Sequence, residues 1–167
     1  MAVKSIKEVF VSLLSHARQN TERSTKFYDE ISRMAEDPQI QQALEARAFV
    51  SKNDLAQLDR CFELLGTKPV QADGRMEEVF AENFRNTIGE IQNPVARRLF
   101  ILSKAIQLAH LRAAEYVALT AAADLSGNYG VGVLVESCLA DHLAFAERTR
   151  RAIRNLVETK VAEKLAA

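Results

Sequence analysis

Several polar side chains interrupt the apolar positions of the predicted helices, and they are the residues of this sequence best suited to chemistry. They are Asn20, Thr21, Ser51, Asp54, His110, Asp141 and His142. Helical spacing places them near mid-height on inward faces, where a buried polar group needs a partner. Imidazole and carboxylate groups are suitable ligands for iron and manganese. The candidate metal ligands are therefore His110, Asp141, His142 and Glu115.

The same polar residues could instead satisfy one another in a closed network of hydrogen bonds and ion pairs. A site for two metal ions in a four-helix bundle uses about four carboxylates, including Glu-x-x-His motifs. The sequence contains no Glu-x-x-His motif, and fewer than four acids can be placed facing inward. Arg112, if it faces inward, would pair with Asp141 and repel a cation. We therefore predict the network, with iron or manganese binding as the alternative, and we predict no catalytic residue and no organic cofactor.

Apolar periodicity and end signals predict five helices that would position these side chains. Their ranges are 5–35, 38–65, 75–91, 94–125 and 129–160. Ser5 and Glu8 can form a capping box at the first start. Asp37 and Asn93 each precede a proline, which is typical of helix starts. Gly66 suits the end of the second helix because glycine readily adopts the left-handed conformation found there.

The connection between the second and fourth of these helices decides the predicted topology. It has about 27 residues, whereas antiparallel neighbours in a bundle need only about two to eight. It can therefore run the length of the bundle, which makes helices 38–65 and 94–125 parallel. Two hairpins joined by a long crossover are the arrangement of ferritin-like four-helix bundles. We predict that residues 1–167 form one such all-α domain, with one short extra helix on the crossover.

The composition excludes several classes of protein. Hydrophobic residues make up 48% of the chain, with six Gly, three Pro and no Trp, which is typical of a helical protein. Lys+Arg and Asp+Glu number 22 each, so the charge gives no reason to expect nucleic acid or a membrane as partner. No signal-peptide core and no run of about 18 apolar residues is visible, so we expect the cytoplasm. Cys61 and Cys138 lie in apolar settings and are expected to be reduced and buried.

Four segments and five single residues carry a resemblance to a known family. They are residues 5–14, 55–62, 65–69 and 76–82, and His110, Tyr116, Glu136, Ser137 and Asp141. In order and spacing these positions resemble the YciE/YciF-type ferritin-like stress proteins of bacteria over nearly the whole chain. The resemblance implies a ferritin-like bundle with one extra helix, a homodimer, a link to stress responses and a candidate dimetal site.

Most ligand positions of that family are substituted in this sequence. The family's first-helix Glu falls at Thr21, although a shift of one residue would offer Glu22. The other helix positions fall at Val50, Ala109, Arg112, Ala140 and Asp141, and only the last of these is acidic. On the crossover, Glu82 matches a family acid. The resemblance therefore implies the fold, while the metal site is expected to be degenerate.

These observations lead to one expected function and two alternatives. We expect a non-catalytic, stress-associated structural protein that self-associates as a homodimer or larger assembly. The first alternative is a protein that binds iron or manganese through the candidate ligands. The second is a partner-binding module that uses an exposed crossover face with Phe80 and Phe84. The predicted core includes Leu58 and Leu99, where replacement by Ala should cost roughly 2–5 kcal/mol.

Overall fold

The structure, a computed structural model that describes residues 5–72 and 74–166, consists of five α-helices. The helices are α1 (Ile6–Met34), α2 (Pro38–Leu65), α3 (Arg75–Glu90), α4 (Pro94–Leu125) and α5 (Tyr129–Ala166). No strand occurs among the described residues. This confirms the all-α prediction, and α5 continues to Ala166, beyond its predicted end at residue 160.

The helices begin and end at the local signals in the sequence. The Ser5 side chain accepts a hydrogen bond from the Glu8 backbone N–H at 3.2 Å. Asp37 and Asn93 each accept two backbone N–H bonds in the first turns of α2 and α4. Gly66 follows α2 with φ of 59°, a conformation that costs glycine little. These caps satisfy part of the backbone donors and acceptors that every helix end leaves open.

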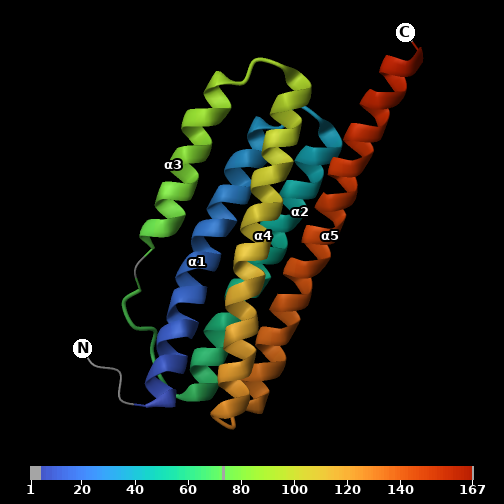
Figure 1. Ribbon diagram of the computed structural model, residues 1–167. Coiled ribbons are helices and arrows are strands. Elements are labelled where there is room, and N and C mark those ends of the chain that lie inside the picture. Colours follow the sequence, from blue (N-terminus) through green and yellow to red (C-terminus); the bar gives the residue numbers. More distant parts are fainter. Residues whose placement is uncertain (1–4, 73, 167) are drawn as a thin grey trace.

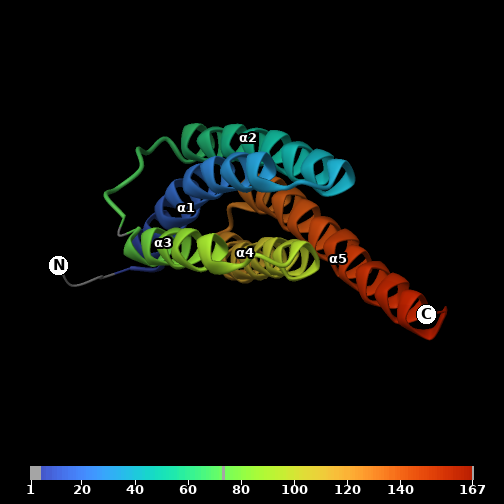
Figure 2. The same ribbon diagram turned by 90° about the horizontal axis from the view of Figure 1, so that it is seen from above.

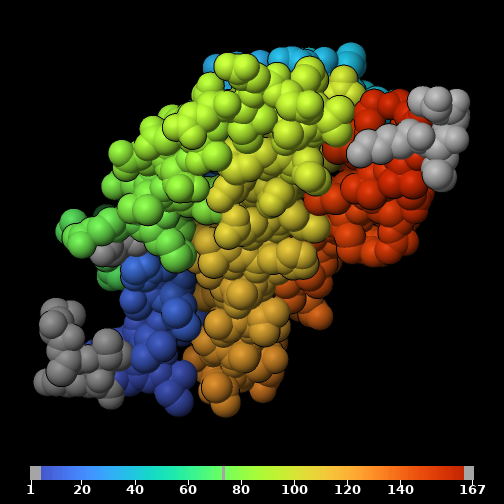
Figure 3. All heavy atoms as spheres, turned by 45° about the horizontal axis from the view of Figure 1, so that its top comes forward, coloured from blue at the N-terminus to red at the C-terminus, as the bar shows by residue number. Residues whose placement is uncertain are grey.

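The four long helices α1, α2, α4 and α5 form a bundle, and the shorter α3 lies on its surface (Figure 1). α1 contacts α2 and α4, and α5 contacts the same two helices, so α1 and α5 are diagonally opposed. The connection after α2 returns along the bundle before α4 begins, so α2 and α4 run in the same direction (Figure 1). The topology is therefore the predicted pair of hairpins with a long crossover. The crossover helix α3 lies beside α4 on one face of the molecule (Figure 3).

The apolar core is divided into two clusters, one toward each end of the bundle. One contains Phe27, Tyr28, Ile31, Leu44, Phe84, Ile101 and Phe145 among others. The other contains Phe10, Leu14, Leu58, Phe62, Tyr116, Leu119 and Val135 among others. Leu58 is fully buried as predicted, whereas Leu99 is 40% exposed. The prediction for Leu99 is wrong because Ile101, Leu102 and Ala105 face the core and turn Leu99 outward.

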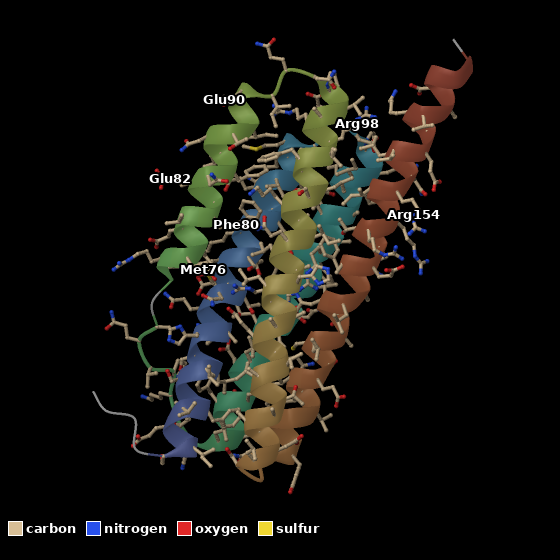
Figure 4. All side chains as sticks on the ribbon, viewed as in Figure 1. Met76, Phe80, Glu82, Glu90, Arg98 and Arg154 are labelled. Carbon is tan, nitrogen blue, oxygen red and sulfur yellow. The ribbon has the colours of Figure 1, made fainter. Side chains whose placement is uncertain are left out.

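The crossover helix turns its aromatic residues toward the bundle. Phe84 is fully buried, and its ring centroid lies 5.1 Å from that of Phe27. Phe80 is half-buried, and its ring lies 5.4 Å from Phe27 (Figure 4). The prediction that these two rings form an exposed docking face is therefore wrong. The rotation of α3 about its axis instead places these rings against the apolar faces of α1 and α4.

α5 is the one described helix that is long and apolar enough to cross a membrane by length and composition alone. Its inner face packs against α2 and α4 through Val131, Val135, Cys138 and Phe145. The apolar character of that face is thus accounted for by the bundle. The last turns of α5 lean away from the other helices (Figure 2).

Candidate functional site

The two apolar clusters are separated by a layer of buried charged residues. One half of this layer is built around Arg47 on α2, whose side chain is 1% exposed. Its Nη2 atom donates to Asp54 Oδ2 at 2.8 Å. The two residues are seven positions apart, so they share one face of α2. The same Nη2 atom lies 3.0 Å from Nε2 and 3.1 Å from Nδ1 of His142, which α5 supplies and which is fully buried.

Burial controls the ionisation of this group. It lowers the pKa of His142 to about 2, and the positive charges of Arg47 and Arg112 lower it further. The imidazole is therefore neutral and can accept a hydrogen bond from the guanidinium. Burial also raises the pKa of Asp54 to about 6, while Arg47 opposes that shift. At neutral pH the group is an Arg–carboxylate pair with a neutral histidine beside it.

The other half of the layer is built around Arg112 on α4, which is fully buried. Its Nη2 atom donates to Glu77 Oε1 at 2.6 Å and lies 3.1 Å from Glu115 Oε1. Glu77 comes from α3, so this ion pair joins the crossover helix to the bundle. Asn20 on α1 donates to Glu115 Oε1 at 2.9 Å. Burial raises the pKa of Glu115, and the charge of Arg112 and the Asn20 hydrogen bond oppose it.

A third contact links α1 to α4 within the same layer. Thr21 and the Tyr116 hydroxyl form a 2.8 Å hydrogen bond, and both residues are fully buried. The Tyr116 ring lies 5.1 Å from the ring of His142. Glu22 points outward and pairs with Lys26. The sequence left open whether Thr21 or Glu22 occupies the inward position on α1. In the structure Thr21 occupies it.

Two of the four candidate metal ligands do not face the layer. His110 and Asp141 are both exposed, so their predicted inward positions are wrong. With Arg112 facing inward, His110 lies about 200° further around α4. Asp141 is displaced by about 100° from the inward His142. His142 and Glu115 do reach the layer, but Arg112 pairs with Glu115 and Glu77, and not with Asp141 as predicted.

The layer uses two residues that the sequence analysis did not identify, Arg47 and Glu77. The spacing of Arg47, Ser51 and Asp54 on one face of α2 was the signal for the first. On the crossover, Glu82 is exposed, and the buried acid is Glu77. Helical spacing was the signal for Glu77, which lies three, seven and eleven residues before Phe80, Phe84 and Ile88 and therefore shares their face, whereas Glu82 does not.

The donor set of the layer does not fit a pair of metal ions. In the described part of the chain, no three His, Cys, Asp or Glu side chains gather to hold a metal. The carboxylates of Asp54, Glu77 and Glu115 are each within ion-pair distance of a guanidinium. Nε and Nη1 of both Arg47 and Arg112 lack a partner among the described residues. Those four nitrogens are hydrogen-bond donors, and donors call for an acceptor and not for a cation.

The topology and the central polar layer define a ferritin-like helical bundle. Three solved structures show the same fold. The E. coli stress protein YciF matches with a TM-score of 0.88 and 20% identity, covering 93% of this chain and 99% of its own. YcfI from Rhodopseudomonas palustris gives a TM-score of 0.84 at 19% identity, covering 89% of this chain and 94% of its own. Symerythrin from Cyanophora paradoxa gives a TM-score of 0.64 at 20% identity, covering 94% of this chain and 88% of its own.

The chain belongs to the family described as "Domain of unknown function (DUF892)", which matches residues 5–166. This membership and the YciF likeness confirm the family resemblance seen in the sequence. No curated protein sequence matches the chain. At about 20% identity, the structural likenesses establish the fold and leave the activity to be argued from the site.

Proposed function

We propose that this protein is a non-catalytic, stress-associated structural protein that self-associates, in which buried arginines stand where a ferritin-like bundle would hold metals. The stress association is carried over from YciF, which is named a stress protein. The non-catalytic role is argued from the layer itself. Cys61 and Cys138 are free and buried, which agrees with a reducing compartment such as the cytoplasm.

The observation that carries the proposal is the pair of guanidinium groups at the centre of the bundle. Arg47 and Arg112 are 2% and 0% exposed, and a guanidinium does not lose its proton in a protein. A divalent ion about 5 Å from such a charge would be repelled by roughly 6–7 kcal/mol at an effective dielectric of about 20. The two arginines therefore replace the charge of a metal and also engage the carboxylates that would bind one.

Metal analysis tests the non-catalytic part. We expect substoichiometric iron and manganese by inductively coupled plasma mass spectrometry after loading and desalting. We also expect a melting temperature that a chelator does not change, because only a bound ligand stabilises by mass action. One or two tightly held ions per chain, lost on His142→Ala substitution, would contradict the proposal and support the metal-binding alternative.

Exposed apolar residues near the α4–α5 turn support self-association. Val117 and Leu125 lie eight residues apart on one face of α4 and are 56% and 75% exposed. Tyr129 and Val133 lie four apart on α5 and are 68% and 67% exposed. Exposed apolar patches are typical of protein–protein contacts, and these four side chains are proposed to form one. Most oligomers of identical chains are two-fold dimers, so a homodimer is proposed.

Light scattering of variants tests this surface. The unchanged protein should be a dimer at micromolar concentration, and Leu125→Glu or Val133→Glu should shift it toward the monomer. Val79→Glu is the matched control, because Val79 is 58% exposed on α3, away from the turn. A monomeric unchanged protein would contradict the self-association. If only Val79→Glu dissociated the dimer, the interface would lie on the crossover and not at the α4–α5 turn.

A further inference from the structure

A long groove lies between the first half of α2 and the last half of α5, where α5 leans away from the bundle (Figure 2). Its volume is about 840 Å³, and residues 98 and 102 of α4 also line it. On α5 its lining runs from Phe145 to Glu163, which corresponds to about 27 Å of helix. The volume falls within the roughly 300–1,000 Å³ typical of small-molecule sites.

The inner wall of the groove is apolar. Leu44, Leu102 and Phe145 line it and are 1%, 5% and 3% exposed. Ala152 and Leu156 continue the apolar surface along α5 toward its C-terminus. An extended alkyl chain spans about 15 Å, half of the roughly 30 Å hydrocarbon core of a bilayer. The groove is therefore long enough to hold such a chain against its apolar wall.

The charged residues of the groove are mainly cations. Arg47, Arg98, Arg148 and Lys160 line it, against the two acids Asp37 and Glu163. Asp37 lies 3.5 Å from Arg98, and Glu163 pairs with Lys160, which leaves Arg47 and Arg148 without an acid partner in the groove lining. Arg148 has no ion-pair partner within residues 5–72 and 74–163. An excess of positive charge around a concave site raises the local concentration of anions.

The decisive residue is Arg47, which is one of the residues that line the groove and is 2% exposed. Its Nη2 atom is bonded to Asp54 and His142, but Nε and Nη1 have no partner among the described residues. Those two nitrogens carry three N–H groups, since a guanidinium has five in total and Nη2 carries two. Leaving buried donors without an acceptor is costly. An anionic oxygen that reached Arg47 from the groove would satisfy them with charge-assisted hydrogen bonds.

From the apolar wall, the cationic lining and the unsatisfied donors of Arg47, we propose that this groove binds an anionic amphiphile, with its anionic head on Arg47 and its alkyl chain along Leu44, Phe145 and Leu156. Carboxylate and phosphate heads share this chemistry. The inference does not depend on the proposed structural role, because it uses Nε and Nη1 of Arg47, which take no part in the ion pair with Asp54.

Isothermal titration calorimetry with dodecanoate, below its micelle concentration, tests the proposal. We expect one molecule bound per chain, with dodecanol and dodecyltrimethylammonium binding about tenfold more weakly or not at all. Dodecyl phosphate is the second anionic probe, and the tighter of the two identifies the head group. Binding of dodecanol as tight as that of dodecanoate, or no binding of either anion, would overturn the proposal.

Two variants locate the bound molecule. Ala43→Trp should fill the groove and abolish dodecanoate binding, because Ala43 lines it and is exposed. Ala56→Trp is the matched control, since Ala56 is exposed on α2 outside the groove lining. The double variant Arg47→Met/Asp54→Asn removes both charges of the pair and should lower dodecanoate binding to the dodecanol level. The proposal is wrong if Ala43→Trp leaves dodecanoate binding unchanged. It is also wrong if the unchanged protein binds no anion and Ala43→Trp instead dissociates its dimer.

Discussion

Removing the Arg112 side chain should uncouple the crossover helix from the bundle. Arg112 is fully buried and reaches Glu77 on α3 at 2.6 Å. The variant Arg112→Met keeps most of the side-chain volume but leaves the carboxylates of Glu77 and Glu115 without their cation. Breaking a buried ion pair in this way costs about 3–5 kcal/mol. That is a large part of the roughly 5–15 kcal/mol by which a domain is stable.

Urea denaturation followed by circular dichroism measures this loss, and hydrogen exchange shows where it acts. We expect backbone amides of α3 to lose protection first, because its other ion pairs to the bundle, Arg85–Glu30 and Arg23–Glu78, are partly exposed and contribute little. The double variant Arg112→Met/Glu77→Gln should recover much of the stability, since it removes the unpaired charge on α3 as well. Arg154→Met is the control, because Arg154 is exposed on the outward side of α5 (Figure 4), and it should change stability by less than about 0.5 kcal/mol.

Two results would refute this reasoning. A loss below about 1 kcal/mol in Arg112→Met would place the pair among exposed ion pairs, which contribute little. A double variant as unstable as the single variant would show that the loss comes from packing or from Glu115, and not from the uncompensated carboxylate of Glu77. Double-mutant cycles separate the two causes because the two residues are in direct contact.

Three further predictions follow from burial. Leu58→Ala should cost roughly 2–5 kcal/mol in urea denaturation and Leu99→Ala far less, because Leu58 is fully buried and Leu99 is 40% exposed; equal losses would contradict this. Burial raises the pKa of Asp54 to about 6, so the folded state holds this proton more tightly than the unfolded state. The contribution of Asp54 to the free energy of unfolding should therefore fall by about 3 kcal/mol as the pH rises from about 4 to about 6. Asp54→Asn should lack this pH dependence in parallel titrations. Burial raises the pKa of the Cys61 thiol to about 12 and that of Cys138 further, so neither should react with a disulfide reagent at pH about 8 until the protein unfolds; rapid labelling of the folded protein would refute this.

The outline of the fold could be predicted because its signals are local. The starts of α2 and α4 follow from Asp37 and Asn93, whose side chains cap backbone N–H groups only two or three residues away. The length of the crossover excluded a simple up-and-down bundle. Apolar periodicity also identified residues such as Leu58, because a long amphipathic helix has one apolar face whatever it packs against.

The central layer could be predicted only in part. Thr21, Asp54 and His142 were expected to face inward and do so. His110 and Arg112 are both polar and lie in one turn of α4, so the polar pattern gives two possible phases there. The rotation of α4 is set by the packing of its flanking apolar residues against α1 and α5, which a short window of sequence does not contain.

The sequence by itself thus determined the helices, their order and the presence of a polar layer, because caps and periodicity act within a few residues. Only the tertiary structure decided which polar side chains meet. Glu77 on the crossover and Arg112 on α4 are 35 residues apart in the chain, and Arg47 and His142 are 95 apart. Such pairs depend on how α3 lies across the bundle and how α5 is rotated. These are properties of packing between helices, and they decide that arginines hold the central polar layer together.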